Sequence, residues 1–212
     1  MILTPISDSE LPESLESFAD SLSDDSFRSV FRRVVARGDP ARAGAETCVK
    51  NHSNSIDLIT FFGIGTKPGS PLLDVSWDGA AFRVETEAYV LLHELAHYQL
   101  AAPARRGTID FGLGPGPETG DRGRAERASM LFGLAREREE AMASLLGILW
   151  EAELGQPALA SFLDQNWLEG AARPETRRAA AAHFETTLAN LARGNFVTDA
   201  GRPRMTLRRN AD

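Results

Sequence analysis

Residues 88–100 read Ala-Tyr-Val-Leu-Leu-His-Glu-Leu-Ala-His-Tyr-Gln-Leu and place His93 and His97 four residues apart, with Glu94 directly after the first histidine. A four-residue step on an α-helix returns to nearly the same face one turn later, so both imidazoles can reach one metal ion. Glu94 then points to the edge of that face, where a carboxylate can act as an acid or base beside the ion. The stretch therefore predicts a metal-binding helix.

The neighbouring residues favour a metal over two unrelated core histidines. The helix is apolar around the imidazoles, at Tyr89, Val90, Leu92, Leu95, Ala96 and Leu100. Imidazoles on a mostly buried face need a shared partner, because unpaired polar groups are costly there. Zinc peptidases use His-Glu-x-x-His, and two such histidines with a distant carboxylate also form the facial triad of non-haem iron oxygenases. The motif alone predicts a metal without choosing between zinc and iron.

The third ligand is expected from a long helix predicted for residues 125–154. Glu139 lies at helical spacing from an almost wholly apolar set, Phe132, Ala135, Met142, Ala143 and Leu146. A carboxylate on an apolar face is costly unless it is paired or bound to a metal, so we predict Glu139 as the third ligand. Glu137 is the second choice, and a buried salt bridge from Glu139 to an arginine is the alternative explanation. Glu140 shares its face with polar and small residues and is expected to face solvent.

Composition restricts the class of protein and of partner. The chain has 212 residues, 42% of them hydrophobic, which is enough for one domain with a sizeable core over residues 1–212. A net charge of -7 argues against nucleic acid or an anionic membrane as the main partner. No apolar run approaches the ~20 residues of a membrane span, so we expect a soluble cytoplasmic protein. The single cysteine, Cys48, excludes an internal disulfide and leaves nitrogen and oxygen as metal ligands.

Periodicity predicts an α+β fold, mainly helical, with a small β element. Helices are expected at 11–22, 26–37, 85–100, 125–154, shortly before 164, and at 174–193. Short strands are expected at 56–62, which is rich in β-branched and aromatic residues, and at 72–77. The chain then divides into N-terminal helices and strands (11–83), a metal-binding core (84–154), and C-terminal helices with a tail (155–212). The metal site would lie between two long helices, in a zincin-like arrangement.

A segment rich in glycine and proline, residues 101–120, follows the metal helix directly and is expected to form a loop at the mouth of the site. Within it, Arg105 and Arg106 are candidates for binding an anionic substrate or for pairing with Asp110. Asp110 is itself a candidate substrate contact. Alternatively, the two arginines only favour the C-terminal dipole end of the preceding helix.

Taken together, these residues resemble the elongation factor P hydroxylases. The likeness rests on His93-Glu-x-x-His97 followed by an aromatic residue, on Ala104-Arg-Arg-x-x-x-Asp-Phe-Gly112, and on a glutamate-led helix at Glu139. The specific motifs lie within 89–150, and weaker similarity covers residues 17–204. The chain departs from the family at Pro103, in the Gly/Pro-rich segment after Gly112, and in lacking the family's Lys-Pro-Gln after Glu139.

The resemblance implies a non-haem iron monooxygenase that hydroxylates a modified lysine of the translation factor with O2. By position, His93, His97 and Glu139 would hold Fe(II), and Glu94 would be an acid or base beside it. The substrate would be a protein such as elongation factor P, or a small amino-acyl compound. The departures bear on the substrate more than on the metal.

The sequence is also compatible with two other functions. In a zinc metallopeptidase, the same histidines would hold zinc and Glu94 would be the general base that activates water. In a non-catalytic binding protein, the metal would only stabilise the fold.

Overall fold

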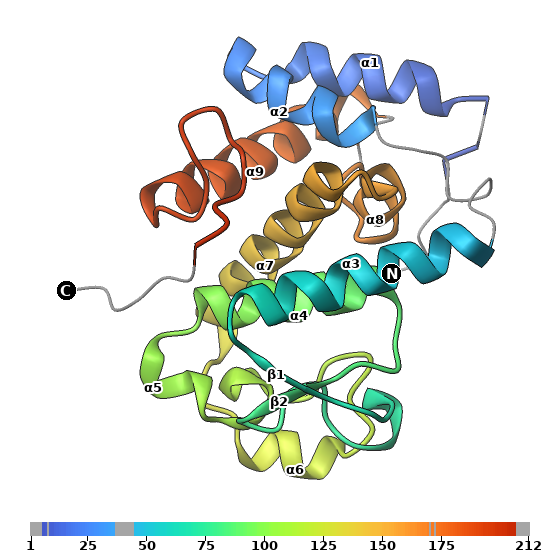
Figure 1. Cartoon of the computed structure of the whole chain (residues 1–212). Helices are drawn as coiled ribbons and strands as arrows, with labels where there is room; N and C mark the ends of the chain where they lie inside the picture. The colour runs from blue at the N-terminus through green and yellow to red at the C-terminus, as the bar shows by residue number, and fades with distance from the viewer. Residues whose placement is uncertain (1–5, 8, 37–44, 170, 172, 207–212) are drawn as a thin grey trace.

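The computed structural model describes residues 6–7, 9–36, 45–169, 171 and 173–206, and shows a mainly helical chain with one small parallel sheet (Figure 1). The predicted end of the second helix, Arg37, lies outside the described residues. In chain order the elements are α1 (Leu11–Ser21), α2 (Asp25–Val35), α3 (Ala45–Phe61), β1 (Gly65–Lys67), the 3-10 helix η2 (Pro71–Leu73), β2 (Ala81–Arg83), α4 (Ala88–Leu100), α5 (Pro103–Arg106), the 3-10 helix η3 (Ile109–Gly112), α6 (Arg122–Arg127), α7 (Gly133–Leu154), α8 (Ala158–Asp164) and α9 (Pro174–Arg193).

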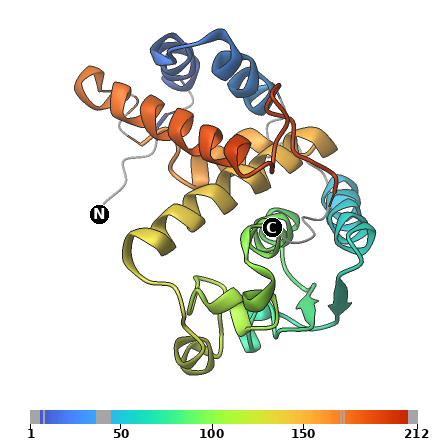
Figure 2. The ribbon, with the colours of Figure 1, turned by 90° about the vertical axis from the view of Figure 1, so that its left-hand side faces the viewer.

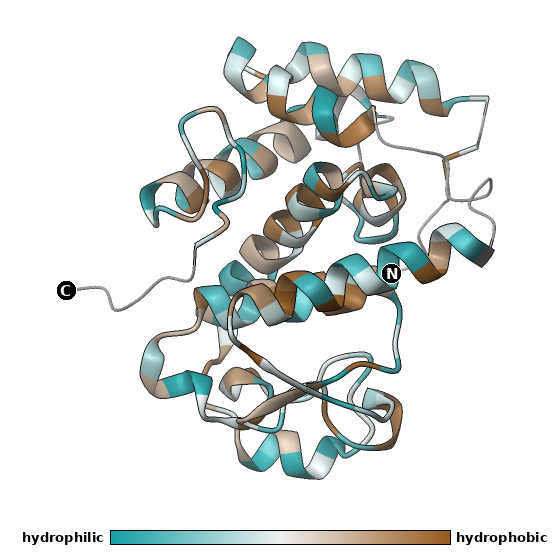
Figure 3. Cartoon of the chain, viewed as in Figure 1, coloured by the Kyte–Doolittle hydropathy of each residue, from teal (hydrophilic) through white to brown (hydrophobic). Residues whose placement is uncertain are grey.

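Helices α4 and α7 pack against each other at the centre of the molecule. On one side of this pair lie α1, α2, α8 and α9, and on the other lie the sheet, α5 and α6 (Figures 1 and 2). The central helices carry many of the most hydrophobic residues, whereas α6 at the edge is mostly hydrophilic (Figure 3). The α4–α7 pair therefore separates two aromatic clusters. One consists of Phe18, Phe31, Phe162 and Phe184, and the other of Trp77, Phe82, Tyr98 and Phe111.

Gly147 allows α7 to approach α4 closely at the first histidine. A Cβ atom at this position would lie 3.2 Å from both the Cα and the backbone nitrogen of His93. Any larger side chain would have to push the two backbones apart. The close approach fixes which face of α7 looks toward the histidines.

The sheet is small, as predicted, but its strands are not where the sequence placed them. β1 and β2 are parallel, with Gly65 paired to Ala81 and Lys67 to Arg83. Residues 56–62 belong instead almost entirely to α3, because Ser55, Leu58, Ile59 and Phe62 are buried at helical spacing. Burial along one helical face outweighed the β-branched composition.

Two further predictions about local structure need correction. Residues 72–77 form the end of η2 and an irregular segment, and Trp77 makes only an isolated bridge to Phe82. The helix predicted for 125–154 is interrupted, since the backbone N–H groups of Met130 and Leu131 donate to the Gly112 carbonyl. Gly133 then starts α7 with a φ of 54°, a conformation that favours glycine.

The remaining helix predictions at 11–22, 85–100 and 174–193 are confirmed within a few residues by α1, α4 and α9. Segment 101–120 is more ordered than expected, because it contains α5 and η3. A bridge between Val197 and Pro203 orders part of the segment after α9. None of the helices in the described part of the chain combines the length and apolar character that crossing a membrane requires.

Candidate metal centre

Three side chains from α4 and α7 converge on one point. The Nε2 atoms of His93 and His97 lie 3.0 Å apart. One carboxylate oxygen of Glu140, Oε2, lies 3.3 Å from His97 Nε2 and 3.7 Å from His93 Nε2. Among the described residues, these three form the group of histidine and carboxylate side chains that could hold a metal ion.

The spacing of these atoms fits a metal ion. Nitrogen and oxygen ligands about 2.1 Å from a common ion lie roughly 3.0 Å apart at right angles and roughly 3.4 Å apart in a tetrahedron. The three separations in the structure, 3.0, 3.3 and 3.7 Å, lie within about 0.3 Å of this expected range. The donor set of two imidazoles and one carboxylate also suits zinc or ferrous iron. His93, His97 and Glu140 therefore fit the predicted ion.

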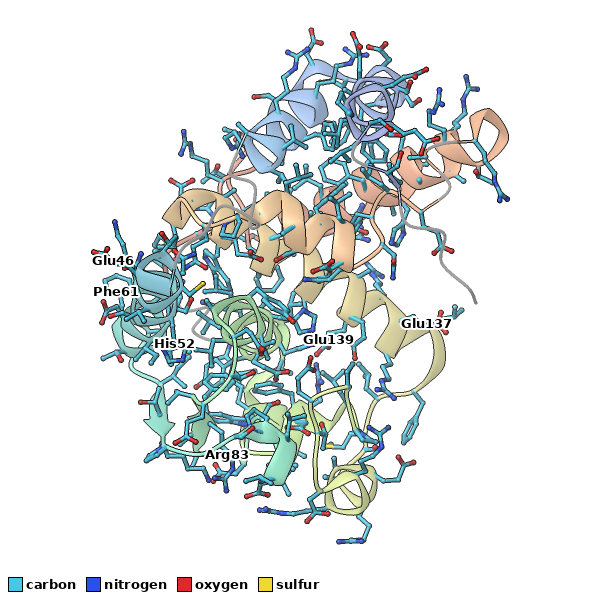
Figure 4. All side chains as sticks on the ribbon, turned by 90° about the vertical axis from the view of Figure 1, so that its right-hand side faces the viewer. Glu46, His52, Phe61, Arg83, Glu137 and Glu139 are labelled. Atoms are coloured by element: carbon cyan, nitrogen blue, oxygen red, sulfur yellow. The ribbon has the colours of Figure 1, made fainter. Side chains whose placement is uncertain are left out.

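Glu139, the predicted third ligand, lies beside this cluster rather than in it. Its Oε2 forms an ion pair with Arg105, and its Oε1 lies 3.9 Å from His97 Nδ1 (Figure 4 shows Glu139 on the inner side of α7). Both of these facing atoms, Oε1 and Nδ1, are buried and have no hydrogen-bond partner among the residues that the structure describes. A carboxylate there can accept a hydrogen bond from Nδ1–H, which leaves Nε2 free to bind a metal.

The structure brings Glu140, and not Glu139, to the two histidines, for a reason that the face of α7 explains. Glu139 is indeed on the apolar face, with a side chain 12% exposed, but Arg105 neutralises it. This is the salt bridge that the sequence left open as an alternative. Glu140 shares its face with Gly147, whose lack of a side chain lets α4 approach there. The face of α7 that was expected to face solvent, because of its polar and small residues, is the face that contacts the histidines.

The carboxylates and imidazoles of the cluster shift one another's pKa. Burial disfavours a charged imidazole, but Glu139 and Glu140 outweigh it and raise the pKa of His97 to about 10. Burial prevails at His93 and lowers its pKa despite Glu140. Although burial opposes ionisation of Glu140, hydrogen bonds to the two imidazoles hold its pKa far below the usual range. The cluster thus stabilises the Glu140 carboxylate as an anion and a positive charge next to it at His97.

Glu94 remains a candidate acid or base. Burial raises the pKa of its carboxyl to about 8, and the carboxylates of Asp110, Glu140 and Glu118 act in the same direction against His97. A carboxyl group with a pKa near neutrality can both accept and release a proton at physiological pH.

The three predicted substrate contacts have structural partners. Arg105 binds Glu139 and donates to the Phe111 carbonyl at 2.8 Å. Arg106 donates to the Tyr98 carbonyl at 3.0 Å and stacks over the Tyr98 ring. Asp110 is 6% exposed and accepts hydrogen bonds from the Trp77 backbone and the Thr119 hydroxyl. These contacts brace α5 and η3 under α4, so they give no support to a role in substrate binding.

The Gly/Pro-rich loop reaches the cluster through Arg136 of α7. This side chain donates to the Pro115 carbonyl at 3.1 Å, and its Nε lies 3.6 Å from Glu140 Oε1. The arginine therefore holds the carboxylate oxygen that does not face the histidines. The loop therefore supports Glu140 through Arg136, on the side away from the histidines. These contacts do not place the loop at the mouth of the site, where the sequence predicted it.

A cavity of about 260 Å³ opens on the other side of the cluster, and sequence reasoning missed it. His93 and Glu140 contribute to its wall together with residues from the α8–α9 connection and from α9, among them Trp167 and His183. His183 lies on α9 and follows a run of four alanines, Ala179–Ala182. Nothing in the local pattern around it could have brought it to α7, because the contact joins segments about 40 residues apart.

Comparisons with protein-family models, with curated proteins and with solved structures found no match to this chain. The geometry of His93, His97 and Glu140 is thus the observation from which a function can be inferred.

Proposed function

We propose that this protein is a metal-dependent enzyme whose ion is held by His93 Nε2, His97 Nε2 and Glu140. The observation that carries the proposal is the convergence of these three atoms within 3.7 Å of one another, beside a cavity. Three protein ligands leave further coordination positions for substrate, which distinguishes a catalytic site from a closed structural one. Glu139, held by Arg105, would orient His97.

We further propose Fe(II) as the metal and hydroxylation as the reaction. Two histidines and one carboxylate are the ligand set of non-haem iron oxygenases, and the motifs resemble elongation factor P hydroxylases. Iron would supply the activation of O2. The balanced reaction converts R–H to R–OH with O2, two protons and two electrons from an external reductant, and the second oxygen atom leaves as water. The substrate would be a lysyl or amino-acyl group, on elongation factor P or on a small molecule.

Zinc-dependent hydrolysis is the second candidate, and Glu94 is the observation that favours it. A half-buried carboxyl directly after a metal-binding histidine is placed to take a proton from a metal-bound water molecule. Zinc would supply Lewis-acid chemistry at the same three ligands. The two candidates differ in the metal and in the need for O2, so one set of measurements separates them.

The decisive experiment is metal analysis of protein purified without oxygen, followed by reconstitution with Fe(II) or with Zn(II). Oxygen-dependent addition of one oxygen atom to elongation factor P or to an amino-acyl substrate, seen by mass spectrometry only with Fe(II), would support the hydroxylase. Peptide hydrolysis restored only by Zn(II) would support the second candidate. A metal that raises the melting temperature without any turnover would point to a binding protein.

The Glu94→Gln variant tests the role of the motif carboxylate. Because Glu94 is not among the three converging ligands, the variant should retain the metal and lose activity, whereas His97→Ala should lose both. Metal content measured by mass spectrometry on both variants gives the contrast. Equal metal loss in the two variants would make Glu94 a ligand and contradict the proposed centre.

A further inference from the structure

We infer that the cavity beside His93 and Glu140 is the substrate-binding site of the proposed enzyme, and that it takes a neutral or cationic group carrying N–H donors. Its volume, about 260 Å³, corresponds to roughly nine water molecules and suits a group the size of one amino-acid side chain. Since two proposed metal ligands form part of the wall, a bound group would lie directly next to the ion. The inference rests on the proposed function for the identity of that neighbour.

The wall formed by the α8–α9 connection is rigid. The Trp167 indole is stacked between Phe162, at 5.8 Å and 20°, and His183, at 5.1 Å and 19°. Its Nε1–H donates to the Ser144 hydroxyl at 2.7 Å, which ties the indole to α7 one turn beyond Glu140. Stacking and this hydrogen bond together fix the shape of the cavity before any ligand binds.

Gln165 supplies the feature that selects a hydrogen-bond donor. This residue lines the cavity, and its Oε1 is buried and has no hydrogen-bond partner within the described structure. A buried amide oxygen without a partner costs about 1–3 kcal/mol. A rotation of the side-chain amide that turns this oxygen into the cavity would let it accept a ligand N–H and would remove that cost. The adjacent Asn166 has a φ of 63°, and the resulting turn directs Gln165 and Trp167 to the same space.

In the metal-free protein the charged side chains of the lining favour a neutral or cationic group over an anion. Glu140 is the acidic residue in the wall, and the described part of the chain contributes neither lysine nor arginine to it. Arg105 pairs with Glu139, and Arg136 lies 3.6 Å from Glu140 Oε1 and donates to the Pro115 carbonyl, so both guanidinium groups already have partners. An anion in the cavity would lose its hydration without gaining a positive side chain. The site therefore differs from the cationic substrate contact expected at Arg105 and Arg106.

Three probes of equal length separate these features, namely butyramide, butylamine and butyrate. Each probe is titrated into metal-free protein, so that no metal ion can bind the carboxylate of butyrate. Binding is followed by two-dimensional ¹H–¹⁵N NMR. The Trp167 indole and Gln165 side-chain signals are assigned from Trp167→Phe and Gln165→Leu. We expect butyramide to shift both signals with a dissociation constant in about the millimolar range, as its six heavy atoms allow. Butylamine should shift them as well, because its ammonium group also carries N–H donors, and butyrate should leave them unchanged.

The Gln165→Leu variant tests the donor. It should weaken butyramide binding, followed by the Trp167 signal, by about tenfold, because the amide loses its acceptor. Asp164→Leu, an equal apolar change at an exposed neighbour outside the lining, should bind butyramide like the wild type. Melting temperatures identify a variant that fails to fold, and in that case the wild-type titrations decide.

The inference is overturned if no probe shifts these signals, if butyrate binds as well as butyramide, or if Gln165→Leu binds butyramide unchanged. Repeating the titrations with Zn(II) added distinguishes its failure from that of the proposed function. Butyramide binding in a protein that takes up no metal would refute the metal centre alone. Metal binding without butyramide binding would refute the cavity alone.

Discussion

Helix α7 holds glutamates in two buried regions that shift their pKa in opposite directions. Near its N-terminal end, imidazoles and Arg105 outweigh burial and lower the pKa of Glu139 and Glu140. Near its C-terminal end, burial raises the pKa of Glu151 to about 8, and the Ser161 hydroxyl is the hydrogen-bond partner that opposes it. Burial of a carboxyl group therefore does not identify a site. What identifies the N-terminal region is the set of nitrogen atoms that converge on the carboxylate.

The largest effect should separate the two neighbouring glutamates of the first region. Glu140→Gln removes a proposed ligand, so metal affinity should fall by about 100-fold or more, whereas Glu139→Gln removes only the group that orients His97 and should cost about 10-fold. Competition with a metal-binding dye measures both affinities.

Glu137→Gln is the matched control, since this exposed side chain lies on the same helix and points away from α4 (Figure 4). It should bind metal like the wild type. If Glu139→Gln loses more affinity than Glu140→Gln, the carboxylate predicted from the apolar face is the ligand after all.

The two glutamates also show how far the sequence could lead. His93, Glu94 and His97 follow from local spacing on one helix, and the structure places both histidines as predicted. The sequence also indicated that Glu139 is buried, but its partner Arg105 is 34 residues away and could be foreseen only as an alternative. Glu140 depends on the close contact of Gly147 with His93, and the cavity depends on α9. Contacts between distant segments leave no periodic signal in either segment.

An intermediate effect is expected at Arg105, which distinguishes a structural from a substrate-binding arginine. Arg105→Gln leaves the Glu139 carboxylate in a site where it is only 12% exposed, so the variant should lose about 3 kcal/mol of stability. Arg127→Gln, at an exposed position of α6, should lose less than about 0.5 kcal/mol. Denaturant unfolding measures both. Unchanged stability of Arg105→Gln, with weaker substrate binding, would restore the role that the sequence predicted for this residue.

The smallest effect, and the one that depends on pH, belongs to the second region. In the folded protein the pKa of Glu151 is about 8, above its usual value of 4.5, so the native state keeps this carboxyl protonated between the two values. The stability that this proton provides is fully present below about pH 4.5 and is lost as the pH rises through 8. Glutamine has nearly the shape of the protonated acid, can still accept from Ser161, and does not titrate.

Glu151→Gln should therefore melt at nearly the wild-type temperature at about pH 5 and at a higher temperature than the wild type at about pH 8.5. Thermal unfolding across this range, followed by circular dichroism in metal-free protein, provides the comparison. A difference that does not change with pH would mean that Glu151 is ionised in the native state and has a cationic partner. The two regions of α7 would then be alike in charge, and only the convergence of His93 and His97 on Glu140 would set the first apart.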